Sequence, residues 1–562
     1  MGAPLDVDKL RKRVMSIKAS LMDDRNDWQA LWTELRDYFS PYRGRNITGA
    51  ESGELTNAGL KRLEKIWDCT HLRNVSNAAA GMHSGLTSPN RPWFKLSFGN
   101  DEIDDSWQVR RWLYEVETLM YAVFHGSNVY SSLHQAYREL TTFGTTSMAV
   151  VEDFENVIHA RSFTIGEFFL GADHLNRVDT FMRRAEFTAR MMLDQFGEDR
   201  LSDQVKDALK NNREKTRFTC WQLVLPADPE HEVRDALGRP YVSIWFEETT
   251  TKEKGTFLQI SGFDELPILT PRYETIADDV YGVGPAFYVL NDCKSAMKLA
   301  KKILVAVDKS IDPPVVADAV LKNKSINTMP AGVTFIDDFI EGQPRLQPLY
   351  QLNFDLPSAN QRLEQLQISI AEGLFSDLFR MLQMQTGTMT ATEVAERQQE
   401  KLLLLGPFIE RAHFELLDPL INRTFNLMAR LDLLPEAPPE IEGLDVQVQY
   451  VSILAQAQKL AGITAMEQLA AYAGNLSAVD ESVLDNFDVD ESFREYAERL
   501  GTNPRVVVSR EQVAEIRQRR AIAMQQQQAM EQAAVMAEGA KVLSETDTGG
   551  NNALTALMGG LG

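Results

Sequence analysis

One lysine-rich helix carries the residues whose type and spacing most clearly suggest chemistry. The stretch AFYVLNDCKSAMKLAKKILVAVDKS covers residues 286–310. At about 100° per residue, five of its lysines fall within an arc of about 100°; they are Lys294, Lys298, Lys301, Lys302 and Lys309. The apolar residues on much of the opposite side are Cys293, Met297, Ile303, Leu304 and Val307. A purely cationic face opposite a packed face is typical of a surface that meets DNA phosphates, and a solvated lysine face would give the same pattern.

An uncharged segment, QMQTGTM at 383–389, separates two long helical patterns. Its candidate contact residues are Met384, Gln385, Thr386, Gly387 and Thr388. The next helix has a strong start signal, because the Thr390 hydroxyl can accept the N–H of Glu393 while the Glu393 carboxylate accepts the N–H of Thr390. Met389 and Val394 fall at the N′ and N4 positions of a hydrophobic staple. We therefore expect a true loop before this helix, which an ordinary interhelical connection would also explain.

Motifs of nucleotide, metal and nucleophile chemistry are weak or missing. No GxxxxGK[ST] phosphate loop occurs, so an ATP-driven motor is not expected. GVGPAF, residues 282–287, lacks the third glycine of a dinucleotide fingerprint, and Ser84 in GMHSG is out of register for a GxSxG nucleophile. No HExxH occurs, and Cys69 and His71 have no second ligand pair at metal spacing. We predict a protein that is not an enzyme and uses no cofactor or metal. An acid–base hydrolase using some of its carboxylates is the alternative from another class.

The composition describes a large, acidic chain. It has 562 residues, of which 44% are hydrophobic, and a net charge of −22. That charge repels nucleic acid at long range, so any DNA would be met by a restricted positive surface. Cys69, Cys220 and Cys293 lie far apart, which fits a reducing compartment rather than a disulfide framework. No apolar run approaches the roughly 18 residues that span a bilayer, so we expect a soluble protein that does not bind a membrane.

Helical and strand-like patterns alternate along the chain, which predicts an α+β fold. Apolar spacing predicts helices at about 5–40, 59–86, 104–140, 286–310, 358–382, 391–433 and 510–543. The helix from 391 is expected to break at Gly406-Pro407. Within 145–280, β-branched and aromatic runs such as RFTCWQLVLP and YVSIWFEE predict strands. LDVQVQYVSIL predicts a further strand after the long helix.

Five motifs, in order, give the chain a family resemblance. They are SGLTSPNRPWFKL, VYGVGPAFYVLND, MTATEVAERQQEKLLLLGPFIERAHFELLDPLINRTF, VQYVSILAQAQK and SREQVAEIRQRRAIAMQQQQ. Together with the basic helix, a Pro-rich insert at 311–355 and the uncharged loop, they resemble the portal, or head-to-tail connector, proteins of short-tailed double-stranded DNA phages. The resemblance runs from about residue 10 to 540.

The resemblance implies a portal-type fold with a mixed wing, two stem helices, a small clip and a helical C-terminal crown or barrel. The implied parts are an N-terminal wing at 1–285, stem helix 1 at 286–310, the clip at 311–355, stem helix 2 at 356–382, a tunnel loop at 383–390, a long helix and C-terminal wing at 391–500, and a crown helix with its tail at 501–562. The stem lysines and the tunnel loop would then line a DNA channel. Without a ring of arginines, the uncharged loop would permit sliding contact instead of binding phosphates tightly.

The resemblance also implies the partners. The chain would form a ring, expected to hold twelve copies, at one vertex of the virion after assembly in the host cytoplasm. Its partners would be double-stranded DNA without sequence specificity, a terminase that supplies ATP-driven packaging, capsid and scaffold proteins, and tail adaptor proteins. The segment 479–500 has eight acids and two arginines, so it is expected to face protein or solvent rather than DNA. A tail adaptor or scaffold-binding protein without a DNA channel is the alternative.

Overall fold

The computed structural model describes residues 6–43, 47, 60–104, 106–231, 233–247, 257–311, 315–317, 346–348, 355–377, 405–441, 443–444, 446–451, 469–476, 487–499, 508 and 510–545. The chain divides into two compact units, Met1–Gln458 and Lys459–Gly562, and each is described by itself. The described residues of the first unit form helices and four sheets, which have two, two, three and five strands. The fold is therefore α+β, as the sequence predicts. Within these residues, no helix is long and apolar enough to cross a membrane.

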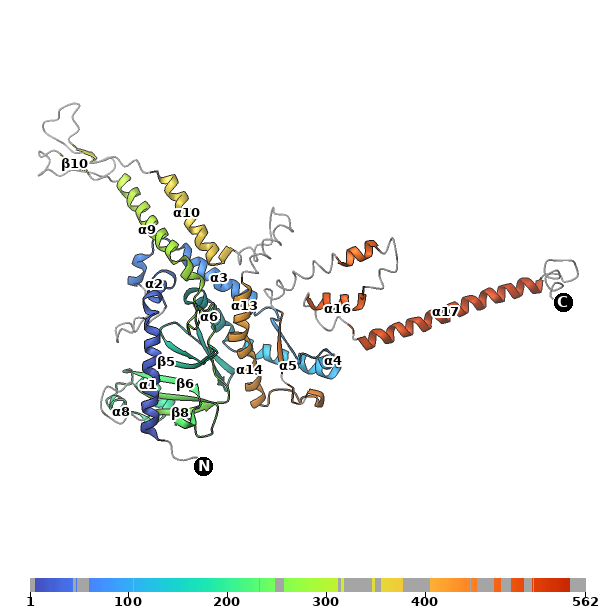
Figure 1. Cartoon of the computed structure of the whole chain (residues 1–562), viewed down its shortest axis with the longest axis horizontal. Coiled ribbons are helices and arrows are strands. Elements are labelled where there is room, and N and C mark those ends of the chain that lie inside the picture. Colours follow the sequence, from blue (N-terminus) through green and yellow to red (C-terminus); the bar gives the residue numbers. More distant parts are fainter. Residues whose placement is uncertain are drawn as a thin grey trace, which may run out of the picture. The chain divides into compact units, whose positions relative to one another are not determined.

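The largest sheet of the first unit has five antiparallel strands in the order β4-β5-β6-β7-β8 (Figure 1). Its strands are β4 (Phe168–Ala172), β5 (Val178–Thr188), β6 (Arg217–Pro226), β7 (Tyr241–Glu247) and β8 (Phe257–Phe263). One face packs Trp221 and Leu223 against α1 (Val7–Asn26). The other face packs Phe187 and Trp245 against α7 (Ala189–Phe196) and α8 (Asp203–Lys210). Alternation of apolar side chains along each strand thus supplies two helix-covered faces.

A second core lies between a three-stranded sheet, β3-β2-β9, and the helices around it. The elements here are α3 (Thr70–Leu86), α4 (Asp101–Asp104), α5 (Trp107–Gly126), α6 (Val129–Phe143), β2 (Ser147–Asp153), β3 (Val157–Phe163) and β9 (Ile268–Leu269). The helix predicted at 104–140 is therefore interrupted. Asn128 causes the break, because its side-chain amide pairs with both backbone groups of Ala160 on β3, at 2.7 and 2.9 Å.

The remaining N-terminal segments also depart from the predicted helices. The helix predicted at 5–40 is α1 followed by α2 (Gln29–Phe39), which separate where Trp28 stacks on Trp32 and both rings contact Tyr281. The shorter helical turns are η1 (Leu60–Lys65), η2 (Glu198–Arg200), η3 (Pro229–His231) and η6 (Pro439–Ile441). Strand runs were better predicted, since RFTCWQLVLP and YVSIWFEE coincide with β6 and β7.

Two distant segments meet in an antiparallel ribbon of β1 (Phe94–Ser97) and β12 (Gln447–Tyr450). Side chains of α5 hold this ribbon. Glu117 Oε1 accepts the N–H of Leu96 at 2.8 Å, and the Tyr121 hydroxyl accepts the N–H of Trp93 at 2.8 Å. The ribbon therefore returns the chain after α14 (Asp418–Arg430) to the N-terminal helices.

The segments predicted as stem and clip contain two long helices and a small two-stranded ribbon among the described residues. They are α9 (Pro285–Ile311), β10 (Val315–Ala317), β11 (Leu346–Pro348) and α10 (Leu356–Gly373). Helix α10 ends nine residues before the predicted 382. Phe375 takes a φ of 55°, a left-handed conformation that ends an α-helix, and Leu374 beside it is fully buried. The segment after 377 lies outside the described residues.

A helix with an internal π turn closes the first unit. It consists of α13 (Gly406–Ala412), the π turn η5 (His413–Leu417) and α14 (Asp418–Arg430). The predicted break at Gly406-Pro407 coincides with the start of α13, whose first turn holds Pro407. In the second unit, residues 469–476 are helical, and Arg517 of α17 (Arg510–Glu545) pairs with Asp490 of α16 (Val489–Arg499) at 2.5 Å.

Glu117 makes the ribbon contact sensitive to pH. Burial raises the pKa of its carboxyl group to about 7, although the Leu96 N–H opposes the shift. The pKa of this carboxyl group is higher in the folded than in the unfolded protein, so its protonated form stabilises the fold. This stabilisation is complete below about pH 4.5 and is lost as the pH rises through 7. Glu117→Gln stays neutral and keeps an acceptor for Leu96, so we expect it to raise the free energy of unfolding at pH 8 by about 2 kcal/mol. Thermal unfolding from pH 5 to 8 measures this. Glu115→Gln, on an exposed part of the same helix, should change little, and an equal gain for both variants would contradict the assignment.

Candidate functional site

Helices α9 and α10 pack side by side (Figure 1), and α9 carries the five predicted lysines. Cys293 and Met297 of α9 are buried in the same core as Leu366 and Ile370 of α10. At the end of α10, Gly373 approaches α9 so closely that an added Cβ would lie 2.3 Å from Val289 Cγ1. Burial raises the pKa of the Cys293 thiol to about 12, so this sulfur is a packing group and not a nucleophile.

Two of the five predicted lysines contact other parts of the same chain. Lys294 Nζ lies 2.5 Å from Glu34 Oε2 on α2. Lys301 Nζ lies 5.0 Å from the centroid of the Trp67 ring, within cation–π range. Both side chains therefore help to dock α9 on the N-terminal helices.

The other three lysines, Lys298, Lys302 and Lys309, are exposed. Within the part of the chain that the structure describes, none of them makes an ion pair. The expected division of α9 into a packed and a purely cationic face is wrong for its second half, because its buried residues end at Ile303. Leu304 is 47% exposed, and Val305, which falls within the lysine arc, is 42% exposed. The distal half of α9 thus presents cations and apolar side chains together.

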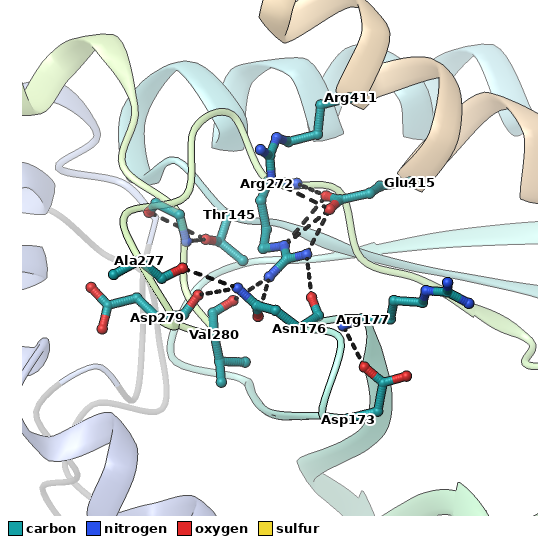
Figure 2. Close-up of polar contacts among 11 residues, drawn as sticks. Thr145, Asp173, Asn176, Arg177, Arg272, Ala277, Asp279, Val280, Arg411 and Glu415 are labelled. Atoms are coloured by element: carbon teal, nitrogen blue, oxygen red, sulfur yellow. Dashed lines mark hydrogen bonds and ion pairs between the residues drawn. The ribbon is translucent and has the colours of Figure 1, made fainter.

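A buried arginine holds the loop that precedes α9 (Figure 2). Arg272 Nη2 donates to Glu415 Oε1 at 2.7 Å, and the Arg272 backbone N–H donates to Glu415 Oε2 at 2.8 Å. The same guanidinium donates to the side-chain and backbone oxygens of Asn176, at 3.0 and 2.9 Å. Only 5% of the Arg272 side chain is exposed. One side chain therefore joins the β4–β5 turn, the loop before α9 and the π turn.

The glycines of GVGPAF permit a close backbone approach. A Cβ at Gly284 would lie 2.5 Å from the carbonyl oxygen of Leu140 and 2.8 Å from the nitrogen of Gly144, at the end of α6. Thr145 completes the contact, because its hydroxyl accepts the N–H of Gly282 at 2.7 Å. Packing, and not a dinucleotide site, accounts for this motif.

The other chemical candidates have structural partners. Ser84 lies within α3 and donates to the carbonyl oxygen of Gly81, and His71 Nε2 lies 2.7 Å from the carbonyl oxygen of Tyr38. Among the described residues, no group of His, Cys, Asp and Glu could hold a metal ion. The predicted loop and its capping residues, 383–394, lie outside the described residues, so their assignment stays a prediction.

Sequence reasoning missed Arg272, Asn176 and Glu415. Each is an ordinary residue in an acidic chain, and their partners are 96 to 143 positions away. Asn176 gives the one local signal, since asparagine in the turn DHLN is compatible with its φ of 57°.

Comparisons with known proteins agree with the resemblance. The profile of the family described as "Bacteriophage head to tail connecting protein" matches residues 11–507. The portal protein of Salmonella phage epsilon15 is 37% identical over 555 residues, covering 98% of both chains. A protein of Bordetella phage BPP-1 named "Probable portal protein" is 36% identical over 550 residues, covering 97% of both. A solved chain from the neck of an empty GTA particle aligns with a TM-score of 0.34 at 11% identity, covering 73% of this chain and 88% of that one. The chain belongs to the bacteriophage head to tail connecting proteins, and its resemblance to portal proteins is confirmed.

Gly284→Ala tests the close approach before α9. The added methyl group would meet backbone atoms that cannot move aside, so we expect a loss of about 2 kcal/mol or more in the free energy of unfolding. Gly126→Ala is the matched control, because a Cβ there meets nothing within 4 Å and alanine favours the helix. Chemical denaturation of both variants measures the difference. A Gly284→Ala variant as stable as the Gly126→Ala variant would show that the backbone contact is not tight.

Proposed function

We propose that this protein is a structural, non-enzymatic portal that forms a closed ring at one capsid vertex of the virion. The ring would be the channel for genome packaging and ejection, and the docking site for terminase and tail proteins. The observation that carries the proposal is the family match over residues 11–507, together with two portal relatives that align along nearly the whole chain. Head-to-tail contacts that close by rotation produce such rings from identical subunits.

The distal half of α9 supports a subunit contact. Leu304 and Val305 are 47% and 42% exposed, and Ile311 at the end of the helix is 78% exposed. Exposed apolar side chains on a regular helix favour burial against another surface. In a ring, a neighbouring copy would cover Leu304 and Ile311, which fall outside the lysine arc, and would leave the lysines and Val305 of the same helix turned toward the axis.

Lys298, Lys302 and Lys309 support contact with DNA. They are exposed cations on one helix of a chain whose net charge is −22. Repeated around a ring, they would form belts of positive charge that attract phosphates without reading sequence. Lys294 and Lys301 are less suited to this role, because Glu34 and Trp67 already engage them.

The tunnel-loop role of 384–388 also belongs to the proposal. Its support is the sequence alone: an uncharged loop between the two helical patterns, followed by a capping box at Thr390 and Glu393. Such a loop would touch passing DNA sterically and add no phosphate-binding charge.

Ring assembly is the first test. Twelve copies of the 63.4 kDa chain correspond to about 760 kDa, and we expect light scattering after gel filtration to give a mass near this value. Class-averaged electron micrographs should show an opening wide enough for duplex DNA. A single 63.4 kDa species at micromolar concentration would count against the ring. A ring without such an opening would favour the adaptor alternative.

Charge reversal of the exposed lysines of α9 is the second test. The variant changes Lys298, Lys302 and Lys309 together to Glu. It should leave the ring intact and weaken the binding of a short DNA duplex at least tenfold at about 50 mM salt. The effect should be smaller at higher salt. Fluorescence anisotropy over a salt series measures this. The control reverses Lys210, Arg213 and Lys215, which are exposed on and after α8, with the same change in net charge. An equal loss in the control would mean that overall charge, and not the stem surface, controls binding.

A further inference from the structure

The sequence explains why a π turn interrupts the helix that runs from Gly406 to Arg430. Pro419 has no N–H to donate to the carbonyl of Glu415, four residues earlier, and its ring would clash with that carbonyl in an α-helix. The chain takes a π turn at His413–Leu417 just before this proline. A π turn is rare and occurs mostly as a single turn inside an α-helix, frequently at functional sites, so we ask which contacts support this one.

Arg272 supplies that support on one side of the π turn (Figure 2). Glu415 accepts both the backbone N–H and the guanidinium of Arg272, and Arg411 one turn earlier lies 3.7 Å from the same carboxylate. Arg272 cannot swing away, because Asn176 and the carbonyl of Val280 hold its other nitrogen. Asn176 is fixed in turn, since its amide donates to the carbonyl of Ala277 at 3.3 Å.

The adjacent tyrosine supports α13. The Tyr273 ring stacks on Phe408 with centroids 4.4 Å apart and an angle of 20° between the planes. Consecutive residues of one loop thus contact both the first turn of α13 and the π turn.

The β1–β12 ribbon supports the π turn through His413. The His413 and Tyr450 rings stack at 3.7 Å with 4° between their planes, and the Tyr450 hydroxyl donates a short hydrogen bond to Asp418. Burial lowers the pKa of His413 to about 4, so the imidazole is neutral near pH 7, and its Nε2 is shielded from solvent. His413 therefore reports on whether the π turn keeps its register.

We infer that Arg272 and Glu415 are a positioning pair that holds the helix in its π register and so fixes the rotation of α13 against the base of the stem. A return to the α register would remove one residue from the turn, turning α13 by about 100° and shifting it by about 1.5 Å relative to α14. Glu415 would then leave Arg272, and Phe408 would leave Tyr273. That a rotation of α13 would affect a DNA channel rests on the proposed function. The geometry of the Arg272–Glu415 pair does not depend on it.

Chemical modification of His413 tests the pair. The variants are Glu415→Gln and Arg272→Lys, made in the full chain; the second keeps the cation but cannot bind Glu415, Asn176 and Val280 together. Diethyl pyrocarbonate reacts with neutral, accessible imidazole, and peptide mass spectrometry reads each site. At pH 6.5 we expect His413 to react at least threefold faster in both variants than in the wild type. His71, which is 1% exposed, should stay protected and so show that the chain remains folded.

The matched control is Asp264→Asn, which removes an ion pair to Arg430 of α14. The Arg430 side chain is 45% exposed and the Asp264 side chain is 58% exposed. It should leave the reaction rate of His413 at its wild-type value, since exposed pairs constrain structure weakly. Unchanged His413 reactivity in Arg272→Lys would overturn the positioning role, because charge alone would then suffice. The readout does not need a ring. A wild-type chain that never forms rings would therefore count against the proposed function only, and wild-type rings with protected His413 in both variants would count against the pair only.

Discussion

The approach of Gly284 to the end of α6 is the constraint on which the placement of α9 depends. Backbone lies on backbone there, with no space for a Cβ on either Gly284 or Gly144. Because α9 begins at the next residue, Pro285, the direction of this helix is set by a contact that only glycine permits. Arg272, twelve residues earlier, anchors the other end of the same loop. The loop 270–284 therefore fixes both the start of α9 and the position of the π turn.

Charge in this protein acts locally and against the sign of the whole chain. The net charge of −22 gives no attraction for DNA, yet α9 carries five lysines within one arc. The structure divides that arc by contact, because Glu34 and Trp67 engage Lys294 and Lys301, while the three remaining lysines lie exposed. Helical spacing alone cannot distinguish the engaged lysines from the exposed ones, since it gives no information on which neighbours a helix contacts.

Sequence patterns predicted the α+β class, the position of α9 and several strands, because these depend on local periodicity. They failed where a tertiary contact overrides a local preference. The chain breaks between α5 and α6 at Ser127 and Asn128, where Asn128 pairs with β3, and Phe375 follows α10 in a left-handed conformation. Pro419 is a local signal for the interruption at the π turn, and it lies outside the break predicted at Gly406-Pro407. The Arg272 contacts could not be predicted, since they join residues far apart in sequence that carry no motif.

The contact between Arg272 and Glu415 is an ion pair rather than an apolar contact, and this difference bears on its role. Removing two charges from water costs several kcal/mol per ion, so an apolar pair of similar volume often stabilises a fold equally well or better. An apolar contact would, however, tolerate rotation of a helix by part of a turn. The forked guanidinium of Arg272 donates to Glu415 in one orientation only, because its other terminal nitrogen donates to the oxygens of Asn176 and Val280. The pair thus gives directional definition rather than stability, which is what a helix with an irregular π turn requires if every copy in an assembly is to adopt the same register.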